Sequence, residues 1–574
     1  MAGVIAAGHE KTAEAGEIVL QAGGNAFDAA VAATFMACVA EPTLTSLGGG
    51  GFLLAHAANG TLSEQNQLFD FFTQTPKNRP QPGAKPLNFY PVEANFGDTV
   101  QEFHVGLASM AVPGVLAGLL TVHKQLGRLP LSAVVEPAVI CAREGLPVSD
   151  FQGYCYELLA PILMATARAR QLYAPTGSLL TAGEKLHLPG FANTLESLAS
   201  LGDEGARREF YEGEIARQIV QECQSGEGCL SLDDFREYAV LVRSPLSIDY
   251  RGVQMLTNPP PSAGGSLIAF CLELLDRFEV SKHDFGAPEH LLLLSQAMRW
   301  TNEARRSHLD TALFDPDIAS KFTATGLVDK YAQPLQDIVA KGINRWGSTT
   351  HISVMDDEGN AASVTTSNGE GSSYVIPGTQ IMMNNMLGEE DLNPHGFHQW
   401  AADQRMSSMM APTMVLQGGK PMLVLGSGGS NRIRTAILQV ISNVLDFKMP
   451  ITEAVTAARI HWEKGVFHVE PGFKSMLAKD CKSGQFESGQ LGTEQIVQWQ
   501  QSNMFFGGVH AVGLDGEGAL QGTGDARRRV TLKANAANTP PRIMTCRNQY
   551  HPIPTVMNAC QAMLVHKTDM GSSE

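Results

Sequence analysis

The sequence predicts an α+β protein in which helices pack on β-sheets within one large layered domain. Three observations lead to this prediction: helical patterns fill most of residues 1–345, strand patterns become frequent after residue 345, and both parts contain both kinds of element. An amphipathic helix or sheet must bury its apolar face against another layer, so this mixture favours one layered core. The length of 574 residues would alone suggest about three to five domains.

Two helices are predicted at the start of the chain. The first covers 14–21 and stops at a Gly-Gly pair, because glycine adopts the backbone conformation that commonly ends a helix. The second covers 26–40, and Asn25 directly before it is a favoured N-cap residue. Its continuous run of small apolar residues is too short to span a membrane and predicts a buried helix.

A strand over 52–55 follows a run of four glycines at 48–51. Residues 73–100 are rich in Pro, Asn and Gln and are predicted to form a surface loop. The next part of the chain is mainly helical, and a Pro- and Gly-rich turn at 259–265 precedes its last helix. The predicted helices cover 115–126, 131–143, 191–201, 215–223 and 266–275.

The pattern changes to strands after residue 345. Alternating residues at 351–355 and 361–366 flank the turn sequence Asp-Asp-Glu-Gly-Asn, which predicts a β-hairpin. A helix is predicted at about 431–445. Further strands are predicted at 380–383, 413–416, 421–425, 466–469 and 509–514.

The composition excludes several classes of protein. Apolar residues make up 44% and charged residues 17%, which is a globular balance and not that of a disordered chain. The net charge is −16, and an acidic chain repels nucleic acid and anionic lipid, so neither is an expected partner. No window reaches the roughly 18 apolar residues of a membrane span.

The nine cysteines show no CxxC or zinc-ligand spacing and predict reduced thiols without a metal site. The first ten residues lack the basic and apolar segments of a signal peptide. A cytoplasmic location is therefore expected if Met1 is the native start.

The segment 346–351, Trp-Gly-Ser-Thr-Thr-His, contains a candidate nucleophile. A threonine hydroxyl is weakly nucleophilic and needs a base, which its own α-amine supplies once the chain is cut directly before it. Such an amine titrates at about pH 7.7–8.0, so a useful fraction accepts protons near neutral pH. Taken alone, the segment is a weak signal, and a solvated turn before a strand is the simpler explanation.

Two other segments carry groups suited to binding a substrate. Residues 425–430, Leu-Gly-Ser-Gly-Gly-Ser, lie between a predicted strand and a predicted helix, where backbone N–H groups can line an oxyanion hole. A phosphate loop is disfavoured because no Gly-Lys-Ser/Thr follows. Ser407 and Ser408 present adjacent hydroxyls to a substrate carboxylate. The alternatives are a tight turn and ordinary surface serines.

Together with these segments, a series of ordered motifs resembles the γ-glutamyltransferase (glutathione hydrolase) family of N-terminal nucleophile hydrolases. The resemblance covers roughly residues 4–530, and the order and spacing of its blocks argue against chance. The blocks are AGGNAFDAA at 22–30, GGGGFLL at 48–54, VPGVLAG at 112–118, PPPSAGG at 259–265, TTH at 349–351, NN at 384–385, SS at 407–408, GG at 428–429 and GDARR at 524–528.

The resemblance implies a four-layer αββα sandwich and a precursor that cuts itself at the Ser348–Thr349 bond. The products, residues 1–348 and 349–574, would stay together as one interleaved domain, a heterodimer of two fragments. Thr349 would then attack a small-molecule γ-glutamyl amide, with its α-amine as base. Water or an amine acceptor would release the acyl group. The sequence itself calls for no metal and no cofactor, because Asp, Glu and His occur without ligand spacing and no nucleotide site is visible.

The family's other site residues map onto this sequence as follows. The amides of Gly428 and Gly429 would bind the oxyanion. Ser367 stands where the family has a second hydroxyl that supports the nucleophile, and Asn368 lies close to a substrate-binding asparagine. Glu389 falls where an aspartate is usual and would bind a substrate ammonium.

One departure from the family pattern concerns the residue that binds the substrate carboxylate. The family binds the γ-glutamyl α-carboxylate with an arginine in an Arg-Glu-x-Ala-Pro block, and here Phe72 stands at the arginine position. This loss removes a bidentate carboxylate clamp, and an aromatic residue favours an apolar acyl group. Arg432 or Arg434, beside the oxyanion glycines, is a candidate replacement.

Three hypotheses follow for the function. The leading one is a self-processing γ-glutamyl amide hydrolase or transferase. The second is an acylase of the same fold that acts on a non-glutamyl amide, like the cephalosporin acylase relatives; Phe72 favours it, whereas Glu389 and the Ser407–Ser408 pair oppose it. The third is an uncleaved relative that only binds a ligand, and the presence of Thr349 opposes it.

Overall fold

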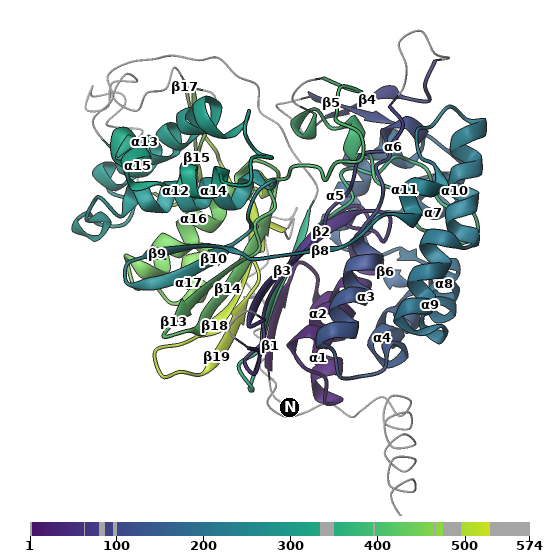
Figure 1. Ribbon diagram of the computed structural model, residues 1–574, viewed down its shortest axis with the longest axis horizontal. Helices are drawn as coiled ribbons and strands as arrows, with labels where there is room; N and C mark the ends of the chain where they lie inside the picture. The colour runs from purple at the N-terminus through teal and green to yellow at the C-terminus, as the bar shows by residue number, and fades with distance from the viewer. Residues whose placement is uncertain are drawn as a thin grey trace, which may run out of the picture.

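The computed structural model describes residues 3–61, 64–79, 86–95, 100–332, 349–393, 396–463, 465–473 and 495–528. At its centre, two six-stranded sheets pack face to face. Helices cover the outer face of each sheet, so the layers run helix, sheet, sheet, helix from right to left in Figure 1. The predicted α+β class and the four-layer αββα sandwich are confirmed.

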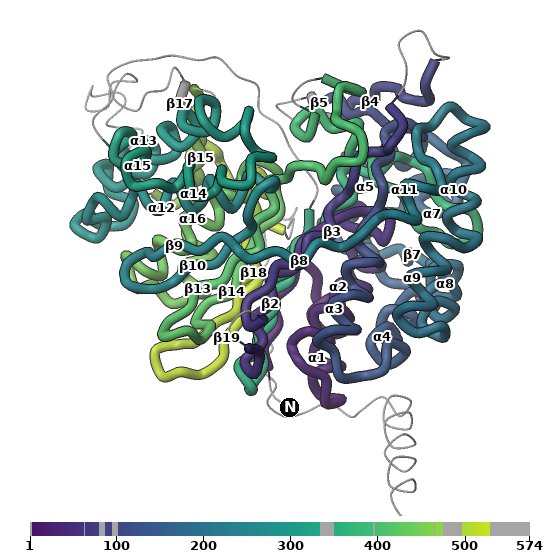
Figure 2. Tube along the Cα trace, viewed as in Figure 1, coloured from purple at the N-terminus to yellow at the C-terminus, as the bar shows by residue number. Residues whose placement is uncertain are grey.

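The first central sheet has the order β1-β11-β12-β2-β3-β8, and every neighbouring pair is antiparallel. Strands from before and after Thr349 are therefore hydrogen-bonded to one another. Figure 2 shows this mixing in the middle of the molecule. The strands are β1 (Gly3–Ala7), β2 (Gly50–His56), β3 (Asn66–Phe71), β8 (Leu241–Arg243), β11 (Thr350–Asp356) and β12 (Ala361–Ser367).

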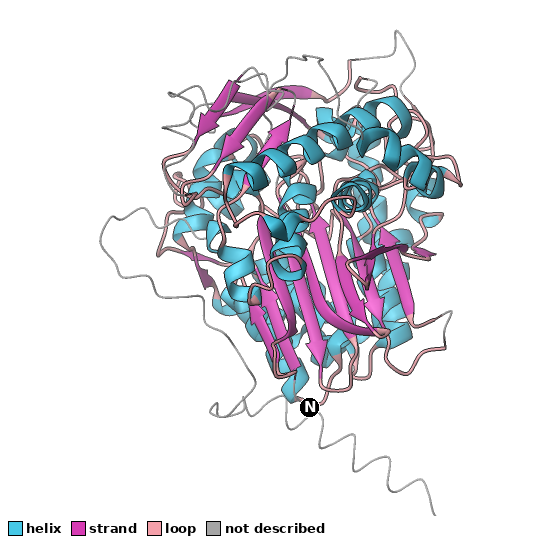
Figure 3. Cartoon of the chain, turned by 90° about the vertical axis from the view of Figure 1, so that its left-hand side faces the viewer, coloured by secondary structure: helices cyan, strands magenta, loops and turns pink. Residues whose placement is uncertain are grey.

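The second central sheet has the order β19-β18-β14-β13-β10-β9 and is also antiparallel throughout. Figure 3 shows strands of the central layers side by side. This sheet, too, combines strands from both sides of Thr349. They are β9 (Leu246–Tyr250), β10 (Val253–Thr257), β13 (Thr413–Gln417), β14 (Lys420–Gly428), β18 (Gly508–Leu514) and β19 (Leu520–Thr523).

The helical layer on the first sheet is built from the N-terminal part of the chain (Figure 1). Its helices are α1 (Glu10–Gln21), α2 (Ala26–Ala40), α3 (Val115–Leu126), α4 (Leu131–Glu144), α5 (Asp150–Leu158), α6 (Ala160–Leu163), α7 (Ala167–Tyr173), α8 (Pro189–Ser200), α9 (Gly202–Glu212), α10 (Glu214–Ser225) and α11 (Leu232–Arg236). Those on the second sheet are α12 (Ala263–Leu275), α13 (Pro288–Ala304), α14 (Ile318–Phe322), α15 (Thr325–Ala332), α16 (Arg432–Leu445) and α17 (Ile451–Thr456).

Helix α2 forms where the sequence predicts it. The Asn25 side chain accepts hydrogen bonds from the backbone N–H groups of Phe27 and Asp28, and the Asp28 carboxylate accepts one from the backbone N–H of Asn25 in return. This capping box satisfies N–H groups that no earlier carbonyl can reach. Every residue of α2 is buried, because the helix packs between α1 and strands β11 and β12.

Strand β2 shows how the layers are held together. Its side chains alternate, so Leu53 and Ala55 pack into the core under the first helical layer, whereas Phe52 and Leu54 pack into the core shared with the second sheet. Both faces of the strand are therefore apolar, as a strand inside a four-layer sandwich requires. The same arrangement fixes the register of the neighbouring strands.

Two predictions of secondary structure were wrong. The predicted loop 73–100 ends in a strand, β4 (Tyr90–Asn95), which pairs with β5 (Val100–Val105). Residues 380–383 form only isolated bridges, because Met382 and Met383 pair singly with Val375 and Gly48 instead of joining a ladder. The remaining short strands are β6 (Leu146–Pro147), β7 (Lys185–Leu186), β15 (Ile460–Glu463), β16 (Val466–Val469) and β17 (Gln495–Gln498).

Candidate functional site

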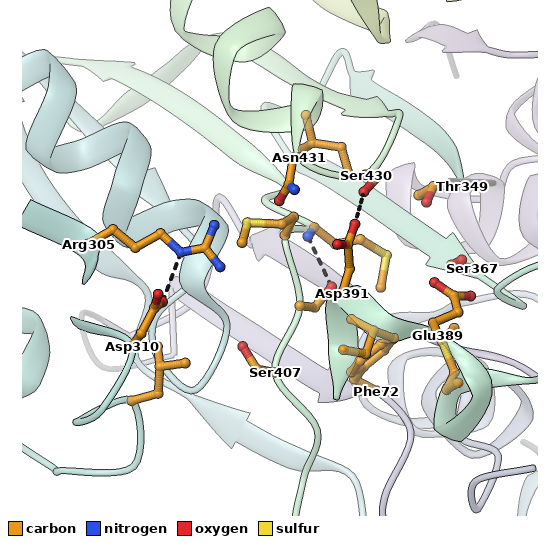
Figure 4. A pocket seen from close by; sticks show the side chains of 17 residues that line it. Phe72, Arg305, Asp310, Thr349, Ser367, Glu389, Asp391, Ser407, Ser430 and Asn431 are labelled. Carbon is orange, nitrogen blue, oxygen red and sulfur yellow. Dashed lines mark hydrogen bonds and ion pairs between the residues drawn. The ribbon is translucent and has the colours of Figure 1, made fainter. Parts of the chain in front are cut away.

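A cavity of about 100 Å³ lies at the end of the first sheet where β11 begins and β12 ends. Thr349 and Ser367 line it, together with Glu389, Ser407 and Ser408 (Figure 4). These residues come from distant parts of the C-terminal half of the sequence. The fold thus brings the candidate nucleophile and most of the candidate substrate-binding residues to one place.

Thr349 directly precedes β11 and is 5% exposed. Ser348, on the other side of the predicted cleavage point, lies outside the described residues. The next residue is firmly held: Thr350 Oγ1 donates a hydrogen bond of 3.0 Å to Glu41 Oε1, and Thr12 Oγ1 donates one of 3.2 Å to Glu41 Oε2. These contacts fix the start of β11 and therefore the position of Thr349.

Burial raises the pKa of the Glu41 carboxyl group to about 7, although the hydrogen bonds from Thr350 and Thr12 oppose this shift. A carboxyl group with a higher pKa in the folded state retains its proton longer than in the unfolded chain. Its contribution to stability is full below the unfolded pKa, declines as the pH rises and is lost above the folded pKa.

We expect Glu41→Gln to have a higher thermal midpoint than wild type. The difference between the two midpoints should grow as the pH rises from about 4.5 to 7 and stay constant above pH 7. The neutral amide keeps the shape of the side chain and never has to ionise in the interior. The measurement is thermal unfolding at a series of pH values. Glu517→Gln, in an exposed turn, is the control. A difference between wild type and Glu41→Gln that does not change with pH would contradict this expectation.

Gly428 is the last residue of β14 and lies against Thr349. A Cβ atom at Gly428 would lie 2.1 Å from the Thr349 carbonyl oxygen and 2.3 Å from Arg528 Nη2, so no larger residue fits without movement. Gly429 has a φ of +122°, a conformation that other residues rarely adopt. Neither glycine is part of the cavity lining, whereas the two residues that follow them, Ser430 and Asn431, are.

Arg528, whose role the sequence did not indicate, lies beside Gly428. Its guanidinium is buried, and neither Nη1 nor Nη2 has a hydrogen-bond partner. The motif that contains it is anchored by Asp525, which forms ion pairs with Arg459 at 2.8 Å and with Arg527 at 3.1 Å. The buried guanidinium of Arg528 thus lies next to Gly428, which lies against Thr349.

Ser367 and Asn368 follow each other at the end of β12 but differ in position. Ser367 lines the cavity, and its hydroxyl oxygen accepts a hydrogen bond from the backbone N–H of Gly369. Asn368 is buried outside the cavity lining, and its amide group donates to the carbonyl oxygens of Met382 and Met383. Asn368 thus supports the segment behind the cavity wall.

Acidic side chains dominate one part of the cavity. Glu389 and Asp391 both line it, and Ser430 donates a hydrogen bond of 3.0 Å to Asp391 Oδ2. Glu389 Oε1 is buried without a hydrogen-bond partner. Burial, together with the nearby charges of Glu370 and Asp391, holds the pKa of Glu389 well above its usual range. A carboxyl group whose Oε1 has no hydrogen-bond partner thus lines the same cavity as Thr349.

Ser407 and Ser408 both line the cavity, and Figure 4 shows Ser407 across the cavity from Asn431. The backbone around Ser408 is tied to the start of α12, because its carbonyl oxygen accepts hydrogen bonds from the Ser262 hydroxyl and from the backbone N–H of Ala263. The Pro- and Gly-rich turn before α12 thereby positions the pair.

The arginines predicted to replace the family's carboxylate clamp do not reach the cavity. Phe72 lines the cavity, is 1% exposed and stacks on Phe52. The Arg432 guanidinium instead lies 4.9 Å from the centre of the Phe505 ring, and Arg434 approaches Glu463 at 3.7 Å. Both arginines point into the core beneath α16, so this part of the prediction was wrong.

The cavity contains a different arginine, which the sequence gave no reason to select. Arg305 lines it together with Asp310, and the two form an ion pair of 2.8 Å (Figure 4). No motif marks these residues, and they come from the helical layer over the second sheet.

Other kinds of site find no support within the described residues. In that part of the chain, no group of three or more His, Cys, Asp or Glu side chains is arranged to hold a metal ion. No described helix is both long enough and apolar enough to cross a bilayer.

Comparison with known proteins finds relatives that match along nearly the whole chain. The chain is 31% identical over 561 residues to a glutathione hydrolase proenzyme of Escherichia coli (strain K12), covering 93% of this chain and 91% of the relative. It is 29% identical over 538 residues to the acylase ACY 1 proenzyme of Pseudomonas sp. (strain V22), covering 91% of both chains.

Solved structures agree with the fold. The structure of a cephalosporin acylase from Bacillus halodurans superposes with a TM-score of 0.78 at 23% identity, covering 92% of this chain and 95% of the other. The sequence profile of the family described as Gamma-glutamyltranspeptidase matches residues 12–534. A match of this extent covers every strand of the two central sheets except β1, and all the residues that line the cavity. The protein is therefore a member of the gamma-glutamyltranspeptidase family.

Proposed function

We propose that this protein cuts itself between Ser348 and Thr349 and then uses Thr349 to hydrolyse small-molecule γ-glutamyl amides, such as glutathione, or to transfer their γ-glutamyl group to an amine. Residues 1–348 and 349–574 would remain associated as a heterodimer, because each central sheet takes strands from both fragments. The observation that carries the proposal is the acidic part of the cavity that Thr349 lines.

The carboxyl group of Glu389 is suited to bind the α-ammonium group of a γ-glutamyl substrate. Its Oε1 has no hydrogen-bond partner, and burial, together with the nearby charges of Glu370 and Asp391, makes ionisation unfavourable in the empty cavity and keeps the pKa of Glu389 raised. An ammonium group would donate to this oxygen and offset the repulsion between the two carboxylates. An acyl group without an amine would leave the carboxyl group unpaired at a cost in binding free energy.

The reaction would proceed through an acyl-enzyme. The α-amine of Thr349 accepts the hydroxyl proton as Oγ1 attacks the carbonyl carbon of the γ-amide. The backbone N–H groups of Gly428 and Gly429 stabilise the oxyanion. The C–N bond then breaks, and the proton passes from the α-amine to the departing amine. Water or a second amine attacks the ester, which releases glutamate or a new γ-glutamyl amide and restores the Thr349 hydroxyl.

We expect Glu389→Gln to raise the KM for γ-glutamyl p-nitroanilide by about 10- to 100-fold, because the variant loses a charge-assisted hydrogen bond to the substrate ammonium. The KM for glutaryl p-nitroanilide, which lacks the amine, should change little. The measurement is steady-state release of nitroaniline from both compounds. Glu390→Gln, at an exposed neighbouring carboxyl group, is the matched control. Equal effects on both anilides would assign Glu389 a purely structural role.

The second candidate is an acylase that acts on a non-glutamyl amide. It is favoured by Phe72, whose ring contributes apolar surface to the cavity where the family pattern has an arginine. Turnover of γ-glutamyl, glutaryl and adipyl anilides by the wild-type protein decides between the two candidates. The γ-glutamyl proposal fails if glutaryl or adipyl anilide is turned over as well as the γ-glutamyl compound.

A further inference from the structure

Arg305 occupies an unusual backbone segment at the edge of the cavity. Helix α13 ends at Ala304, and the chain continues through one π-helical turn, Arg305–Leu309. Such wide turns are rare and occur frequently at functional sites, because they redirect side chains that a regular α-helix would place elsewhere. Here the turn directs Arg305 towards the cavity (Figure 4).

The Arg305 side chain is oriented by one partner. Its Nε donates a hydrogen bond of 2.8 Å to Asp310 Oδ1, and its side chain is 22% exposed. Among the described residues, no hydrogen bond occupies its two terminal nitrogens, which are the paired donors that match a carboxylate. Asp310 thus fixes the direction of the guanidinium and leaves its outer edge available.

Two other arginines near the cavity, Arg405 and Arg432, are engaged elsewhere, and Arg528 does not line the cavity. Arg405 is 6% exposed, and its guanidinium donates to the carbonyl oxygens of Phe72 and Ala239 and to the Tyr238 hydroxyl. Arg432 packs on Phe505. Arg305 is therefore the one Arg or Lys side chain among the described residues that line the cavity.

We propose that Arg305 binds a carboxylate group of the substrate and supplies the guanidinium that is missing at Phe72. The carboxylate would lie between Arg305 and Ser407, which Figure 4 shows on the side of the cavity away from Thr349. This inference rests on the proposed function for the acyl substrate: Glu389 takes the ammonium group and Arg305 the carboxylate. The cavity then selects zwitterionic acyl groups although the usual arginine is absent.

Three anilides that share the same four-carbon acyl chain test the carboxylate and the amine of the substrate separately. The γ-glutamyl compound carries both, the glutaryl compound only the carboxylate, and the 4-aminobutanoyl compound only the amine. Kinetics should be measured with wild type, Arg305→Gln, Arg305→Lys and the control Arg306→Gln. Arg306 lies in the same turn, is 46% exposed in its side chain and pairs with Glu303.

We expect Arg305→Gln to raise the KM about 10- to 100-fold for the γ-glutamyl and glutaryl compounds, with little change in kcat and little change for the 4-aminobutanoyl compound. Arg305→Lys should restore part of the loss, because lysine keeps the charge but not the paired donors. Arg306→Gln should resemble wild type. Equal effects of Arg305→Gln on all three compounds, or on none, would overturn the proposal.

The outcomes distinguish this inference from the proposed function. If wild type turns over the glutaryl and γ-glutamyl anilides equally well, the proposed γ-glutamyl function is refuted. Arg305 is still tested in that case, because Arg305→Gln should lose the preference of wild type for compounds that carry the carboxylate. Calorimetric titration with L-glutamate and with 4-aminobutanoate gives the same comparison without turnover. Thermal unfolding and the fragment pattern on a denaturing gel show whether each variant is folded. If Arg305→Gln binds L-glutamate as tightly as wild type does, Arg305 does not bind the carboxylate.

Discussion

Thr349→Ala is expected to remain a single chain and to lose at least about 10³-fold in activity towards γ-glutamyl p-nitroanilide. Self-cleavage requires the Thr349 hydroxyl to attack the carbonyl carbon of the preceding residue, after which water hydrolyses the resulting ester. Without Oγ1 neither that ester nor the later acyl-enzyme can form. Denaturing gel electrophoresis of the purified protein and anilide turnover measure the two losses separately.

Two neighbouring substitutions serve as controls for Thr349→Ala. Thr349→Ser keeps a hydroxyl at the same atom and should still be cleaved, with reduced activity. Thr350→Ala should also be cleaved, because the Thr350 hydroxyl is committed to Glu41 and does not line the cavity. Cleavage or full activity of Thr349→Ala would show that another residue is the nucleophile. A single full-length band in wild type would favour an uncleaved, ligand-binding relative.

Local signals in the sequence predicted the elements that carry the site. Helix α2 has its own cap at Asn25 and a long apolar run from Ala29 to Ala40 that only Thr34 interrupts. The hairpin of β11 and β12 has strong turn residues and alternating strands, and the structure pairs Thr350 with Thr366 across it. Each of these elements is specified within about 15 residues, so no knowledge of distant contacts was needed.

Elements that depend on distant contacts were not predictable in this way. The hairpin of β4 and β5 lies in a polar, Pro-rich region, and its neighbourhood is stabilised by aromatic packing between Phe89, His104 and Phe397. Residues 380–383 resemble a strand by composition, but Asn384 donates to the carbonyl oxygens of Gly48 and Ala111 and fixes the chain in another path. Composition alone does not contain these pairings.

The same distinction applies to the cavity. Thr349, Ser407 and Glu389 lie in motifs or directly beside them, so the resemblance located them. Arg432 was selected because it follows the glycines in sequence, but its direction on α16 is set by packing against Phe505. Arg305 enters the cavity only because α13 packs on α12, which covers the second sheet, and no local pattern encodes that arrangement.

Gly428→Ala is expected to reduce kcat/KM by about 10²- to 10³-fold and to destabilise the protein by about 1–3 kcal/mol. The added methyl group would lie 2.1 Å from the Thr349 carbonyl oxygen, which is backbone and cannot rotate away. Either the start of β11, which adjoins the nucleophile Thr349, or the end of β14, which carries Gly428 of the proposed oxyanion site, must therefore move. Kinetics and thermal unfolding measure the two effects.

The control for Gly428→Ala is Gly516→Ala, because a Cβ at Gly516 meets no atom within 4 Å and its φ is not positive. That variant should match wild type in both measurements, which shows that the loss of a glycine is not itself harmful. If Gly428→Ala kept wild-type kcat/KM, the contact between Gly428 and Thr349 would not constrain the nucleophile. If it lost stability alone, Gly428 would serve only the packing of the two sheets. A loss of activity in a variant that stays folded at the assay temperature is the result that links the glycine to the chemistry of Thr349.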